Sequence, residues 1–142
     1  MRRSHAWPPC LDCGTFRAVL KRWTCNPRPL SAPERAVMLA LFQAPPLIPD
    51  ADRYVGLLDG LTVVGGCGCG CATVDFVPGD AQGDSRRILD ALGTTAAGGR
   101  VGLIVWGNEG RLTGLEIYDE GAGPDDLGLP DPASVKSWSE YR

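Results

Sequence analysis

The chain has 142 residues, of which 44% are hydrophobic and 22% are charged. These values are typical of one soluble globular domain with a single core, and they exclude a chain that is disordered throughout. The net charge of −3 is unevenly distributed, because residues 1–35 sum to +5 and residues 36–142 sum to −8. An acidic body disfavours nucleic acid as the main partner.

Residues 1–30 are rich in Arg, Pro and Cys and predict an irregular basic arm, within which residues 15–23 have the spacing of a short helix. The arm begins with two arginines but has no apolar stretch behind them, so a secretion signal is not predicted. The longest apolar run, residues 36–48, is interrupted by a glutamine and two prolines and is too short to cross a bilayer. We therefore expect a cytoplasmic protein without membrane contact, whose cysteines are reduced.

A helix is predicted from Ser31, because Ser31 and Glu34 have the spacing of a capping box and Pro33 lies in the first turn. The helix is expected to end near Gln43, since two prolines follow. Its apolar stripe comprises Val37, Met38, Leu41 and Phe42. Asp50 is predicted to cap a second, short helix. The buried side of that helix would comprise Tyr54, Val55, Leu57 and Leu58.

From residue 61 the apolar residues change from helical to alternating spacing, which predicts strands over residues 61–64 and 72–77. Residues 86–92 fit either a helix or a strand. The Thr-Thr and Gly-Gly pairs that follow favour the strand and a hairpin leading into the next apolar run.

Residues 101–106 form a continuous apolar run, and residues 112–118 return from a hairpin turn at residues 107–110. We expect these two strands to supply much of the core, with Trp106 and Tyr118 helping to close it. The other predicted core residues are Val101, Leu103, Val105, Leu115 and Ile117. An acidic segment rich in Gly and Pro follows, in which Asp131 predicts one last helical turn.

The predicted fold class is α+β, with N-terminal helices packed on an antiparallel meander of four to five strands. A parallel sheet is disfavoured because the connection between residues 106 and 112 is too short for a crossover. The predicted organisation is an arm over residues 1–30, one domain over residues 31–135 and a tail over residues 136–142.

Three cysteines alternate with two glycines in Cys67-Gly68-Cys69-Gly70-Cys71. Glycines permit a backbone bend that could turn the thiols of Cys67, Cys69 and Cys71 toward one metal ion. Thiolates suit zinc or cuprous copper. Two other interpretations stay open: small, partly buried packing groups at a strand junction, and redox or nucleophilic chemistry.

A zinc site made from this cluster needs a fourth ligand. The remaining candidates all lie in the N-terminal arm: Cys10, Cys13, Cys25 and His5. Cys10 and Cys13 form a single CxxC pair, which can bind zinc or cycle as a disulfide, and which is also compatible with loose thiols in an arm. Zinc is thus the cofactor to test first.

Residues 28–135 resemble a family of small uncharacterised bacterial proteins, a domain of unknown function. The resemblance rests on the cysteine motif and on the strand Leu115-Glu116-Ile117-Tyr118. Further matching segments are Arg28-Pro29-Leu30, Glu34-Arg35, Asp75-Phe76, Gly102-Leu103-Ile104-Val105, Gly110-Arg111-Leu112 and Leu129-Pro130-Asp131-Pro132. The resemblance implies a compact domain of helices and a meander, and it supplies no established activity.

Enzyme templates find little support in the sequence. The single histidine is His5, so no Ser-His-Asp or Cys-His arrangement can be built from the predicted domain. The Gly-Gly pairs lack the lysine and the strand–helix setting of a phosphate-binding loop. We therefore expect a non-enzymatic protein that binds an unknown protein partner, of an immunity-like or regulatory kind. The alternative is a metal-binding protein that uses the cysteine cluster.

Overall fold

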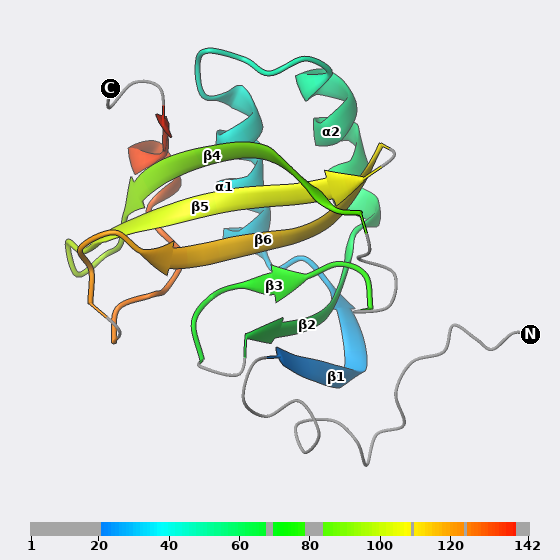
Figure 1. The fold of residues 1–142 in the computed structure, drawn as a ribbon, viewed down its shortest axis with the longest axis horizontal. Coiled ribbons are helices and arrows are strands. Elements are labelled where there is room, and N and C mark those ends of the chain that lie inside the picture. The colour runs from blue at the N-terminus through cyan, green and yellow to red at the C-terminus, as the bar shows by residue number, and fades with distance from the viewer. Residues whose placement is uncertain (1–20, 68–69, 79–83, 109, 124, 139–142) are drawn as a thin grey trace, which may run out of the picture.

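The computed structural model describes residues 21–67, 70–78, 84–108, 110–123 and 125–138 (Figure 1). These residues form two α-helices and one antiparallel sheet with the strand order β1-β2-β3-β6-β5-β4-β7. The strands are β1 (Lys21–Pro29), β2 (Thr62–Cys67), β3 (Val74–Asp75), β4 (Arg86–Thr94), β5 (Arg100–Asn108), β6 (Arg111–Asp119) and β7 (Lys136–Ser137). The predicted α+β class with an antiparallel sheet is confirmed. No helix in the described ranges is long and apolar enough to span a membrane.

Helix α1 (Ala32–Gln43) begins at the predicted capping box. The backbone N–H of Glu34 donates to Ser31 Oγ at 3.2 Å, and the N–H of Ser31 donates to Glu34 Oε1 at 2.8 Å. Both bonds satisfy amides that have no partner within the helix. The predicted stripe is buried against the sheet and comprises Val37, Met38, Leu41 and Phe42.

Helix α2 (Ala51–Leu57) continues into a 3-10 turn, η2 (Leu58–Gly60). Asp50 occupies the N-cap position as predicted, but its side chain accepts no capping hydrogen bond. Its backbone is left-handed, with φ at 64°, a conformation that aspartate tolerates better than most residues. The second helix is instead held to the first by the stacked rings of Phe42 and Tyr54, whose centroids are 5.3 Å apart.

The centre of the sheet is made by β4, β5 and β6, and the strand prediction for residues 86–92 is confirmed. β5 and β6 are joined by the predicted tight hairpin, in which Gly110 has a φ of 80° that favours glycine. The predicted core residues of these strands are buried on the face that carries the helices, each at 3% exposure or less: Val101, Leu103, Val105, Leu115 and Ile117.

Three strand assignments differ from the predictions. Strand β1 lies in the segment predicted as an irregular arm; of the short helix predicted over residues 15–23, residues 21–23 are in this strand and the rest lies outside the described residues. β3 has two residues where residues 72–77 were predicted, and β7 lies in the predicted tail. The sheet therefore has seven strands rather than four to five.

The physical reason is that backbone pairing at a sheet edge does not require alternating side chains. β1 pairs with β2 on both sides of a bulge between Trp23 and Arg28, which interrupts the period-2 signal. The strand order also differs from a simple meander. After β3 the next strand in the sheet is β6 rather than β4, and β4 lies on the far side of β5.

Candidate functional site

The cysteine cluster forms the connection between β2 and β3. Gly70 has a φ of 91°, and its N–H donates to the carbonyl of Cys67 at 3.4 Å, which closes a tight turn. Cys67 and Cys71 are partly exposed, and Cys69 lies outside the described residues. The predicted bend at the glycines is therefore present at Gly70.

Cys71 is connected to the neighbouring sheet through a threonine. Its Sγ lies 3.2 Å from Thr73 Oγ1, which accepts from the N–H of Ile117 at 2.9 Å and donates to the carbonyl of the same residue at 3.3 Å. This chain of polar contacts ties the end of the turn to β6. It gives Cys71 a structural contact that the sequence pattern does not predict.

Within the described ranges, no three His, Cys, Asp or Glu side chains are grouped closely enough to hold a metal ion. Of the predicted ligands, His5, Cys10 and Cys13 lie outside those ranges, and only the backbone of Cys25 is described, in β1. Two of the predicted thiols are thus placed at one turn, and the metal site stays a prediction.

A second candidate site is the sheet face opposite the helices, which we call the outer face. The register of β4, β5 and β6 puts three rows of side chains on it: Arg87, Trp106 and Gly114; Asp90, Ile104 and Glu116; Leu92, Gly102 and Tyr118. Figure 1 shows α1 and α2 behind the sheet, and no described helix lies in front of it. Trp106 and Tyr118 were predicted to close the core, and this is wrong, because they lie on the outer face and are only half-buried.

The ring of Tyr118 lies directly over Gly102, where a Cβ atom would collide with it. Two apolar residues of the outer face are also buried, since Leu92 is 2% and Ile104 is 8% exposed although neither belongs to the core cluster on the helix side. Burial and the nearby carboxylates of Glu120 and Asp90 raise the pKa of Tyr118 above its ordinary value.

Polar groups of the outer face are arranged in pairs around these aromatics. The Nε1–H of Trp106 donates to Glu116 Oε1 at 3.0 Å, which fixes the indole orientation. Arg87 Nη1 and Asp90 Oδ2 form an ion pair at 3.0 Å. A sheet face with half-buried Trp and Tyr side chains among paired charges has the composition of a protein interface.

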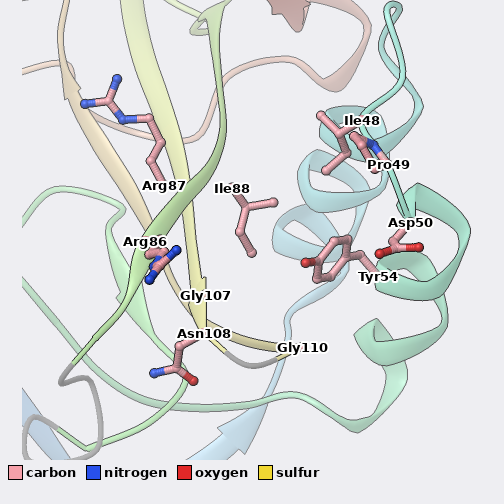
Figure 2. Close-up of a pocket in the computed structure, with 10 residues that line it drawn as sticks. All are labelled: Ile48, Pro49, Asp50, Tyr54, Arg86, Arg87, Ile88, Gly107, Asn108 and Gly110. Carbon is pink, nitrogen blue, oxygen red and sulfur yellow. The ribbon is translucent and has the colours of Figure 1, made fainter.

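A third feature is a hollow between the second helix and the turn of the β5–β6 hairpin (Figure 2). It has a volume of about 370 Å³ and is broadly open to solvent. Ile48, Pro49 and Tyr54 form the wall on the helix side, while Ile88 and Arg86 of β4 face them from the sheet. Asn108 lines the hairpin end of the hollow.

Comparison of the chain with protein-family models, curated proteins and solved structures found no match in any of the three. The resemblance of residues 28–135 to a family of small bacterial proteins therefore stays a prediction.

The sequence analysis predicted neither the outer face nor the hollow. Alternation of Gly102, Ile104 and Trp106 with the core residues of β5 was the available signal for the outer face. Nothing comparable marks the hollow, because its walls come from segments far apart in the sequence.

Proposed function

We propose that this is a non-enzymatic protein that binds a protein partner, of an immunity-like or regulatory kind, through the outer face. One observation carries the proposal: two half-buried aromatic side chains, Trp106 and Tyr118, stand on a sheet face that no described helix covers. Trp and Tyr supply much of the binding energy in protein interfaces, because they bury large areas at little entropic cost.

The charge of this face favours a basic partner surface. Arg87 and Asp90 neutralise each other in their ion pair, which leaves the carboxylate of Glu116 on the face and that of Glu120 directly after β6. The body of the chain, residues 36–142, has a net charge of −8. Complementary charge accelerates association and selects partners, even where it adds little to affinity.

The test is site-specific photocrosslinking in cells of the native host, followed by binding measurements. A photoreactive residue is placed at position 116 of the outer face, and a matched control carries it at Asp52, which is exposed on α2. We expect a discrete crosslinked protein at position 116 that the control lacks. Identical product patterns at both positions would count against the outer face.

With the crosslinked partner purified, Trp106→Ala is expected to weaken its binding at least about tenfold, the usual effect of removing an interface tryptophan. The variant is compared with Asp52→Ala by titration calorimetry, and circular dichroism verifies that both are folded. Unchanged affinity of the Trp106 variant would refute a role for the outer face.

A metal-binding function is the second candidate, and the turn at Cys67 and Cys71 favours it. The hydrogen bond from Gly70 to Cys67 draws the ends of a five-residue segment with three cysteines together. Thiolate ligands must lose their protons, so zinc binding would release protons and weaken as pH falls. Tag-free protein is analysed for metal alongside Cys69→Ser. Stoichiometric zinc that the variant loses, together with a lower melting temperature, would support the site; metal-free protein and an unchanged variant would reject it.

A further inference from the structure

From the hollow of Figure 2, we infer a binding site for a small carboxylate with a compact apolar body. The inference concerns the opposite side of the sheet from the outer face and is independent of the proposed partner. Its volume of about 370 Å³ is within the range of natural small-molecule sites, which begins at roughly 300 Å³.

The apolar part of the site is preformed. Ile88 faces Ile48 and the Tyr54 ring across the space, and these two residues lie one above the other on the helix side (Figure 2). Tyr54 is held by stacking on Phe42, which is 1% exposed, so this wall needs no rearrangement to receive a ligand. A branched aliphatic group fits between two isoleucines and a tyrosine ring by shape and polarity.

The charged part of the site is Arg86. Other arginines are engaged, as Arg28 pairs with Glu34, Arg35 with Asp59 and Arg87 with Asp90. Within the part of the chain that the structure describes, no ion pair involves Arg86. Its guanidinium is exposed at the sheet side of the hollow, where it can bind a carboxylate with two parallel hydrogen bonds.

Two neighbours reinforce the preference for a carboxylate. Asn108 lines the hairpin end of the hollow, where its amide can donate to a carboxylate while its Oδ1 accepts from Arg111 Nε at 3.4 Å. The guanidinium of Arg53 lies against Gly110 at the tip of the same hairpin and adds positive potential there. Asp50 is on the opposite wall, so the negative group of a ligand is directed toward β4.

A carboxylate of this kind occurs on free branched acids and at the C-terminus of peptides. The probes are therefore 4-methylpentanoate for the free acid, N-acetyl-leucine for the peptide terminus and N-acetyl-leucinamide as the matched neutral control. Binding to the full chain is followed by chemical-shift changes of the backbone amides of Ile88, Gly107, Asn108 and Gly110. We expect saturable shifts with both acids and at least about fivefold weaker binding of the amide, the scale of one charge-assisted hydrogen bond.

Two variants and a control complete the test. Arg86→Gln should weaken binding of the acids about fivefold or more, whereas Arg100→Gln, an exposed position at the far end of β5, should leave it unchanged. Asp50→Asn should tighten binding, because it removes a negative charge that repels the carboxylate of the ligand.

Tighter binding of N-acetyl-leucine than of 4-methylpentanoate assigns the site to peptide termini, and the reverse assigns it to free acids. Equal binding of acid and amide, or an unaltered Arg86 variant with an otherwise native spectrum, would overturn the inference.

Discussion

Glu34 joins the end of β1 to the start of α1. Its carboxylate accepts two hydrogen bonds of 2.8 Å from Arg28 and one of 2.8 Å from the backbone of Ser31. The hydrogen bonds from Arg28 lower the pKa of Glu34 below its ordinary value of 4.5, against the opposing effect of burial, and they raise the pKa of Arg28. A carboxylate whose pKa is lowered by folding stabilises the folded state above its ordinary pKa, and this contribution is lost as pH falls through the lowered value.

Glu34→Gln is therefore expected to reduce the free energy of unfolding by about 1 kcal/mol at pH 7, a modest value because Arg28 is 46% exposed and partly screened. The difference from wild type should shrink as pH falls from 4.5 through the lowered pKa of the folded state, because the carboxylate is protonated first in the unfolded chain and only then in the folded protein. Urea unfolding at pH 7, 4 and 3 measures it. Asp59→Asn is the control, since Asp59 is 81% exposed in its pair with Arg35. A constant difference at all three pH values would contradict the assignment to the Glu34 charge.

At the scale of elements, β5 is the strand on which both faces of the sheet depend. Val105 points to the helix side and is fully buried, while its neighbour Trp106 points to the outer face. Val105→Ala should cost about 1–3 kcal/mol, from lost burial and the cavity left behind. Thr62→Ala, exposed on β2, is the control and should stay within about 0.5 kcal/mol of wild type. A neutral Val105 variant in urea unfolding would mean that the strand is not packed as described.

The elements also show which parts of the fold the sequence could predict. α1 was predictable because its cap and stripe are local signals, and β5 and β6 because a hairpin joins adjacent strands. β1 was not, since its pairing with β2 is interrupted by a bulge and its partner lies more than thirty residues away. Trp106 and Tyr118 were misplaced for a related reason: an apolar run predicts burial but does not say which face of the sheet a helix will cover.

For the molecule as a whole, the candidate sites were harder to predict than the fold. The cysteine motif was visible as a pattern, yet the polar link from Cys71 through Thr73 to Ile117 requires the pairing of β3 with β6. The hollow requires Arg86 and Tyr54 to meet, which depends on how α2 packs beside the sheet. Such long-range placements follow from tertiary packing rather than from residue spacing.

The short length of β7 has a consequence for solubility. β7 pairs with β4 only at Ala91 and Leu92, so within the described ranges the other half of β4 is an open sheet edge. Open edges recruit strands of other molecules unless charge or a bulge prevents it. Here Arg86, Arg87 and Asp90 lie along the open half, and a bulge between Arg87 and Leu89 distorts its hydrogen-bonding register.

We expect these charges and the bulge of β4 to hinder self-association through the sheet edge. Arg87→Val removes one charge from the edge and raises its strand propensity, so we expect light scattering on heating to begin several degrees lower than in wild type. Arg100→Val, on β5 within the sheet, is the matched control. Equal onset temperatures of light scattering for the Arg87 variant and wild type would mean that the bulge alone hinders self-association. We therefore expect the edge charges of β4 to keep copies of the protein apart, a requirement separate from any ligand or partner it binds.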